Sequence, residues 1–239
     1  SLLNKKGNYV QLAFNNVNRT PSTNAMGITD FPIIGLNNIK KENHLQLMAA
    51  TGNIKKAWKA SFTYQLINNY QYYSTGYTAA VYQGTIHYIN AQLANQFKLS
   101  THWNWYNEVH LQLVDAASPL RVPTILTRQR IAFEGVFYKN LNMSTGLEFI
   151  YHTNYKANFY MPFTGQFYQQ NEYTLSNRPM VNAFYHMTIK RLKAYIRVEN
   201  LNTLLPTNNA LGNHYNFTAK NYPGTGIWVR VGIWWHFIN

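Results

Sequence analysis

Residues 227–237 read IWVRVGIWWHF, and this stretch near the C-terminus decides the fold class. Its odd-numbered positions hold Ile, Val, Val, Ile, Trp and Phe, whereas its even-numbered positions hold Trp, Arg, Gly, Trp and His. Successive side chains of a β-strand point to opposite faces, so this period of two predicts a strand with one apolar and one more polar face.

The same alternation recurs along the chain. In residues 103–113, Leu111 lies on an apolar face, whereas its neighbours His110 and Gln112 lie on a polar face. Comparable stretches are 58–66, 88–98, 128–137, 143–152, 181–190 and 192–199, with weaker candidates at 9–15 and 44–50. The exceptions are Asn107 on an apolar face and Ile150 and Phe184 on polar faces. We therefore expect about ten strands, most of them near the 9–11 residues that cross a bilayer at a steep tilt.

The connections between these stretches alternate between short and long. Short turns are predicted near 51–55, 99–101, 139–140 and 190–191, and long connections over 18–43, 68–84, 115–124, 153–179 and 202–225. Short periplasmic turns and long extracellular loops are typical of outer-membrane barrels, and an even strand count places both termini in the periplasm. Aromatic residues of the apolar face near the short turns or the C-terminus predict a periplasmic girdle: Trp58, Phe97, Trp103, Phe137, Trp235 and Phe237.

The composition supports the same class. Charged residues make up only 12% of the 239 residues, which is about half of the roughly 25% found in a soluble domain. Aromatic residues are abundant instead, with 19 tyrosines. No stretch reaches the roughly 18 apolar residues of a membrane helix, and the absence of cysteine excludes a disulfide framework. The formal net charge of +13 would suit nucleic acid, but the basic residues are scattered along strands and turns, so we expect no such partner.

Residues 230–237 read polar-x-Gly-x-x-aromatic-x-aromatic, which resembles the β-signal of outer-membrane barrels. The resemblance implies that Gly232, Trp235 and Phe237 form an assembly signal, with the barrel-assembly machinery as a partner. Ile238 and Asn239 follow the terminal Phe of the pattern, which is a departure from the signal.

A longer resemblance begins at Trp103. It is carried by the segments 105–109 (WYNEV), 155–162 (YKANFYMP), 165–171 (GQFYQQN), 189–191 (IKR), 198–202 (VENLN) and 222–223 (YP). Together these resemble the C-terminal part of the Bacteroidota putative porin family. The resemblance implies an outer-membrane diffusion porin. Because members of that family are longer, residues 1–239 are expected to form one barrel domain that is the C-terminal portion of a larger barrel, or a reduced member.

Charged and histidine side chains of the polar face are the candidate lumen-lining residues. They are Glu108, His110, Arg128, Arg130, Glu134, Glu148, Lys193, Arg197, Glu199 and Arg230. These groups could select ions by charge, or they could pair with one another and hold the shape of the barrel, which we favour. In a wide lumen the excess of basic groups would favour anions.

No catalytic site is predicted. Ser144 and His152 share a face but lie about 26 Å apart along one strand, and the chain has no Asp besides Asp30 and Asp115. His110, His152 and His186 share the polar face, but isolated histidines there are more often hydrogen-bonded than metal-bound, so we expect no metal and no other cofactor.

We expect a porin-like barrel in the bacterial outer membrane that passes small polar solutes with a mild anion preference. Its partners would be outer-membrane lipid, the assembly machinery and, as an open alternative, other outer-membrane proteins. Two other functions stay open: a structural or accessory barrel subunit of a larger outer-membrane complex, and a soluble carbohydrate-binding β-sandwich.

Overall fold

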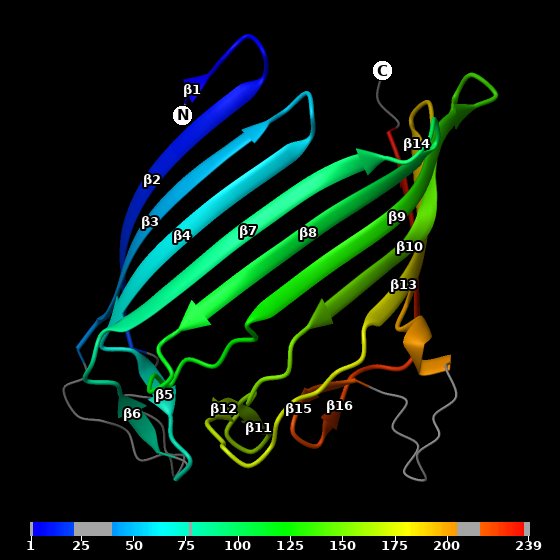
Figure 1. Cartoon of the computed structure of the whole chain (residues 1–239). Helices are drawn as coiled ribbons and strands as arrows, with labels where there is room; N and C mark the ends of the chain where they lie inside the picture. The colour runs from blue at the N-terminus through cyan, green and yellow to red at the C-terminus, as the bar shows by residue number, and fades with distance from the viewer. Residues whose placement is uncertain (1, 22–39, 77, 205–215, 237–239) are drawn as a thin grey trace.

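The computed structural model describes residues 2–21, 40–76, 78–204 and 216–236. These residues form one large antiparallel sheet of eleven strands in the order β1-β2-β3-β4-β7-β8-β9-β10-β13-β14-β17 (Figure 1). Strand β1 (Leu2–Leu3) is a short addition at the edge. The ten longer strands are β2 (Asn8–Arg19), β3 (Glu42–Asn53), β4 (Trp58–Asn68), β7 (Ile86–Lys98), β8 (Trp103–Val114), β9 (Ile125–Phe137), β10 (Leu141–His152), β13 (Met180–Ile189), β14 (Leu192–Glu199) and β17 (Trp228–Trp235). The prediction of about ten antiparallel strands is confirmed.

The short turns join consecutive long strands at one end of the sheet (Figure 1). Tyr138 and Lys139, between β9 and β10, both have positive φ angles (48° and 66°), which suits the right-handed twist of a tight hairpin. The turn predicted at 51–55 lies slightly later, because Gly52 and Asn53 still pair with β4. The Asn53 side chain then accepts a hydrogen bond from the Lys56 amide at 2.8 Å and closes the turn.

The sheet is curved but it is not a closed barrel. Strands β1 and β2 form one edge and β17 forms the other, and within the described residues these edges do not pair with each other. The prediction of an antiparallel barrel wall is therefore confirmed. The described strands do not close this wall into a barrel. Closure depends on the number and stagger of the strands, which the alternation of residues does not specify.

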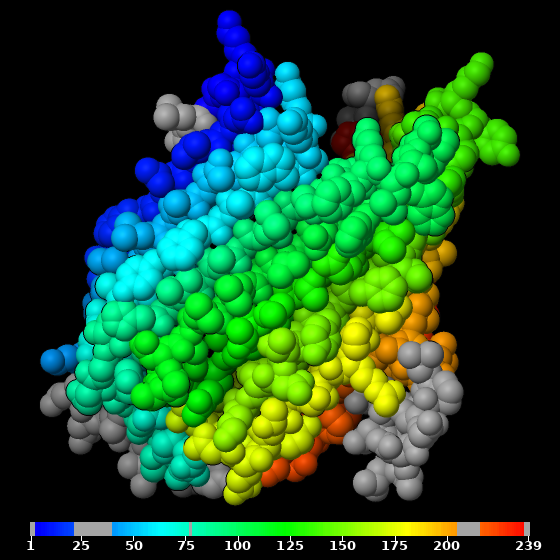
Figure 2. All heavy atoms as spheres, in the orientation of Figure 1, coloured from blue at the N-terminus to red at the C-terminus, as the bar shows by residue number. Residues whose placement is uncertain are grey.

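The two faces of the sheet have opposite chemistry. Apolar side chains are exposed on the convex face, among them Leu12 (76% exposed) and Ile233 (73%), and Figure 2 shows the front of this face. On the other face, polar side chains such as Asn104, Glu148 and Asn182 are buried. A soluble protein would cover the apolar face, whereas a wall in lipid exposes it.

The long connections form a second, smaller structure at the opposite end of the sheet from the short turns (Figure 1). Strands β5 (Gln71–Tyr73), β6 (Ala79–Val81), β11 (Phe159–Met161) and β12 (Gln166–Tyr168) build a four-stranded sheet in the order β11-β12-β5-β6. Strands β15 (Phe217–Ala219) and β16 (Tyr222–Pro223) form a hairpin, and η1 (Leu201–Leu204) is a single 3-10 turn. We call these described connections the loop layer. The predicted connection 18–43 falls largely on residues 22–39, outside the described residues.

None of the described helical residues forms a helix of the length and apolarity needed to span a membrane.

Candidate functional site

The strand register places all ten candidate lumen-lining residues on one face, which we call the inner face. Glu108 lies opposite Arg128, Arg130 lies opposite Glu148, and the register continues through β13 and β14 to Arg230. The alternation of the sequence therefore identified the shared face of these residues. That this face lines a lumen stays a prediction.

Glu148 is the centre of a charge network on this face. Its side chain is only 2% exposed. Arg128 donates hydrogen bonds from Nε (2.8 Å) and Nη2 (2.5 Å) to Glu148 Oε2, and Arg197 donates from Nη2 (2.5 Å) to Oε1. Asn182 donates to Oε1 at 3.3 Å. A buried carboxylate is tolerated only with such partners, because it has lost its hydration.

The network continues toward the C-terminal edge of the sheet. Arg197 forms an ion pair with Glu199 at 3.0 Å, and Glu199 forms one with Arg230 at 3.1 Å. Charges of alternating sign thus run from β9 through β10 and β14 to β17. This is the arrangement expected if the charged residues hold the wall in shape.

A second cluster surrounds Glu134. Its carboxylate accepts hydrogen bonds from Asn104 Nδ2 (2.9 Å), the Tyr106 hydroxyl (2.7 Å) and the Ser144 hydroxyl (3.0 Å), and lies 3.6 Å from Arg130. The Ser144 hydroxyl thus bonds with Glu134, whereas the His152 ring nitrogens lie 3.1 Å from the Thr153 carbonyl and 3.3 Å from Asn177 Nδ2.

The guanidinium of Arg130 explains an exception to the sequence pattern. It lies over the Phe184 ring, with Cζ 4.1 Å from the ring centroid. Phe184, an apolar residue on the polar face, therefore serves as a cation–π partner. Asn107, the polar exception on the apolar face, has a hydrogen-bond partner on the neighbouring strand. Its side chain accepts a hydrogen bond from Gln129 at 2.5 Å, and Gln129 in turn accepts one from the Trp105 indole at 2.8 Å.

The remaining candidates make local contacts. Glu108 lies 3.1 Å from His110 Nε2 and accepts a hydrogen bond from Gln92 at 2.7 Å. Lys193 Nζ lies 5.3 Å from the centroid of the Trp234 ring. Among the residues that the structure describes, no three His, Cys, Asp or Glu side chains are grouped to hold a metal ion.

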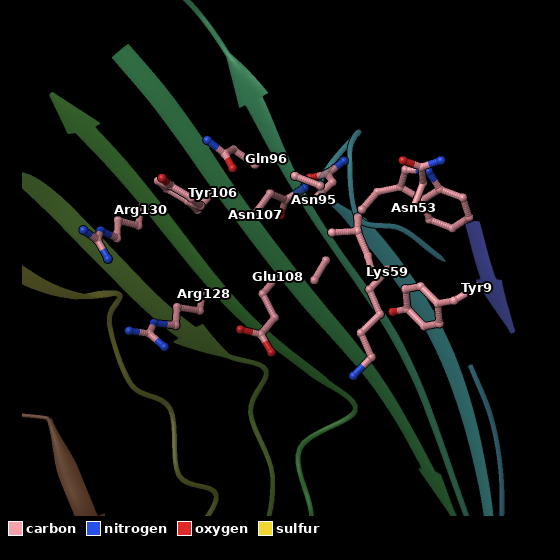
Figure 3. A pocket seen from close by; sticks show the side chains of 14 residues that line it. Tyr9, Asn53, Lys59, Asn95, Gln96, Tyr106, Asn107, Glu108, Arg128 and Arg130 are labelled. Carbon is pink, nitrogen blue, oxygen red and sulfur yellow. The ribbon is translucent and has the colours of Figure 1, made fainter. Parts of the chain in front are cut away.

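Sequence reasoning missed a hollow in the inner face. One row across the sheet runs Tyr9, Gly52, Lys59, Ala94, Glu108 and Arg128. The small residue Ala94 leaves space between Lys59 and Glu108, and the resulting cavity has a volume of about 440 Å³ (Figure 3). The only sequence signal was a small residue at the inward position 94, and it becomes meaningful only once the register places Ala94 between Lys59 and Glu108.

Two residues of the predicted assembly signal, Gly232 and Trp235, lie in the edge strand β17. A Cβ atom at Gly232 would lie 2.2 Å from Tyr195 Cε1, so the absence of a side chain lets the Tyr195 ring cover this position. Trp235 is on the convex face and is 58% exposed. Phe237 lies outside the described residues.

The curved antiparallel wall, its apolar convex face and its charged inner face define the class of outer-membrane β-barrel proteins. Within that class, residues 2–239 match the family described as "Putative porin", and the chain belongs to this family. The Bacteroidota origin and a position at the C-terminal end of a longer chain stay predictions.

Solved structures share the fold. The "Copper transporter OprC" superposes with a TM-score of 0.66 at 14% sequence identity, over 97% of this chain and 37% of that one. "The FrpB iron transporter from Neisseria meningitidis (F3-3 variant)" superposes with a TM-score of 0.58 at 12% identity, over 95% of this chain and 37% of the transporter. The chain thus spans 37% of the length of each structure, and at these identities the likeness concerns the fold alone. A search of curated proteins found no match.

Proposed function

We propose that the chain forms part of the wall of a pore in the bacterial outer membrane through which small polar solutes diffuse. The observation that carries the proposal is the inner face, where charged and amide side chains from consecutive strands line a concave surface opposite an apolar face. Polar lumen walls of this kind are typical of porins.

A mild anion preference follows from the charges of this face. The register places eight basic side chains there against five carboxylates. The basic residues are Arg19, Lys59, Lys98, Arg128, Arg130, Lys193, Arg197 and Arg230, and the acidic residues are Glu42, Glu108, Glu134, Glu148 and Glu199. Because the carboxylates are largely paired, the excess positive charge would act on passing ions.

In a membrane the two edges of the sheet must be paired, since unpaired backbone groups are costly in lipid. We propose that further strands complete the barrel, with the short turns in the periplasm and the loop layer outside the cell. The C-terminal strand, with Gly232, Trp235 and Phe237, would be recognised by the barrel-assembly machinery.

A structural role in a larger outer-membrane complex is the second candidate, and the loop layer favours it. Connections from distant parts of the chain bond to one another there and bury Tyr168 and Leu175. A folded layer at the mouth of a barrel could narrow the lumen or present a binding surface.

Conductance of the full-length protein in planar lipid bilayers separates the two functions. The pore proposal predicts steady single-channel currents and, under a KCl gradient, a reversal potential displaced toward that of chloride. Correctly folded protein that inserts into the bilayer without conducting would contradict the pore and favour the structural role. Currents with a cation preference would overturn the charge selectivity alone.

A further inference from the structure

Lys59 is a basic residue of the inner face that lies outside the ion-pair networks and lines the hollow. Arg128 and Arg130 both line the hollow, but each already contacts a carboxylate, Glu148 and Glu134 respectively. Lys59 has no hydrogen bond or ion pair within the part of the chain that the structure describes, and its side chain is exposed. It therefore presents an uncompensated positive charge at the hollow.

The two sides of the hollow differ in chemistry. Tyr9 and Lys59 lie on one side (Figure 3), with the Tyr9 ring over Gly52, where a Cβ atom would lie 2.9 Å from the Tyr9 hydroxyl oxygen. Glu108 lies on the other side, two strands from Lys59 with Ala94 between them. Adjacent strands are about 4.8 Å apart, so the Lys59 and Glu108 backbones are separated by about 10 Å. Their side chains do not form an ion pair with each other, since Glu108 is held by His110 and Gln92.

The volume and lining of the hollow suit a small organic molecule. Its 440 Å³ lies within the range of about 300–1,000 Å³ found for small-molecule sites. The lining has three cationic side chains and one carboxylate, together with the amide of Gln96 and the ring of Tyr106. Cations bind carboxylate or phosphate groups, whereas amides, a tyrosine hydroxyl and a paired carboxylate bind hydroxyl groups.

We propose that this hollow, the Lys59 hollow, is a binding site for a small hydroxylated organic anion, such as a sugar acid or a sugar phosphate. Lys59 holds the anionic group, and the Tyr9 hydroxyl and Glu108 hydrogen-bond to hydroxyl groups of the solute. The proposal deepens the proposed function, on which it rests, because it gives the pore a preferred class of solute. A weak site of this kind raises the local concentration of the solute without trapping it.

Equilibrium dialysis of the full-length protein in detergent tests the site without relying on conductance. The probes are glucuronate and glucose 6-phosphate, with neutral glucose as the matched control. Both anions should bind more tightly than glucose. Lys59→Gln should weaken binding of the anions about tenfold, because it removes a charge-assisted hydrogen bond, and should leave glucose unchanged. Lys98→Gln is the matched variant, since Lys98 lies on the same face but does not line the hollow.

A second variant tests the space itself. Ala94→Leu should fill the hollow and abolish binding without changing charge, whereas Ala91→Leu on the convex face should have no effect. Circular dichroism checks that each variant is folded. Equal anion binding by the wild type, Lys59→Gln and Ala94→Leu would overturn the site.

Conductance recorded on the same preparations separates this inference from the proposed function. Conducting channels that bind neither anion would overturn the site and leave the pore proposal intact. Anion binding that depends on Lys59 in a protein that does not conduct would uphold the site and overturn the pore. Binding of one anion alone would uphold the site and identify its preferred group as a carboxylate or a phosphate.

Discussion

The large sheet and the loop layer are held together in different ways. In the sheet, every long strand pairs with its neighbour in the chain over many residues, and each face repeats the same chemistry. In the loop layer, single contacts join distant segments: β5 pairs with β12 only at Tyr73 and Tyr168, and the Gln169 side chain donates to the Pro119 carbonyl at 2.8 Å. A change in the continuous sheet should therefore affect the whole wall, whereas the loss of a single contact in the loop layer should act locally.

Removing part of the last strand should have the largest effect. Deletion of residues 235–239 removes Trp235, whose Cα lies opposite Leu192, and shortens the proposed assembly signal. We expect loss of the protein from the outer membrane, because an incomplete edge cannot be paired in lipid. Quantification of the protein in isolated outer membranes measures this. Deletion of residues 218–222 from the loop layer, which is equally long, should leave the membrane level near that of the wild type. Equal losses would show that the two regions do not differ in assembly.

Breaking the Glu148 network should be the next largest effect. Glu148→Gln leaves Arg128 and Arg197 without their buried counter-charge, and loss of one partner from such a network costs about 3–5 kcal/mol. Urea unfolding from lipid vesicles would measure the free energy of unfolding. Glu172→Gln is the control, because Glu172 is exposed in the loop layer and pairs only with Lys220 at 3.3 Å. A cost at Glu148 no larger than at Glu172 would mean that the network does not stabilise the wall.

Much of the sheet could be predicted from the sequence, because a period of two is a local signal. The inward position of Glu148 and Arg197 follows from it, as does the outward position of Leu111. The burial of Glu148 does not, since it depends on the curvature that brings Arg128 and Arg197 to the same carboxylate. The Lys59 hollow was missed for the same reason: Lys59 and Glu108 come to lie on either side of Ala94 only through the register of the strands.

The loop layer could be predicted only as a set of long connections. Its contacts join residues that are far apart in the chain, such as Tyr73 and Tyr168, whose ring centroids are 5.2 Å apart. No periodic pattern specifies such pairs. These connections contain many tyrosines, but the sequence does not indicate which of them meet.

A single contact of the loop layer should give a smaller, local effect. The Asn177 side chain donates to the Phe217 carbonyl at 2.9 Å and accepts from the Phe217 amide at 3.0 Å. Asn177→Ala should destabilise the β15–β16 hairpin locally by about 1–3 kcal/mol, because two hydrogen bonds are lost. Hydrogen exchange with mass spectrometry should show faster exchange in residues 216–223 and unchanged exchange in β8 and β9. Faster exchange throughout the large sheet would contradict the independence of the two regions.

The central claim is that the large sheet has one face in lipid and one face in a polar lumen, and neighbouring substitutions in β8 test it directly. Leu111 lies on the convex face and is exposed, whereas Gln112 lies on the inner face and donates to the Pro123 carbonyl at 3.2 Å. The measurement is the free energy of unfolding from lipid vesicles for Leu111→Arg and Gln112→Arg. Near the bilayer midplane, arginine at Leu111 should cost about 2–4 kcal/mol, because its charge must leave water, and arginine at Gln112 should cost much less. Equal costs at the two positions would contradict the claim.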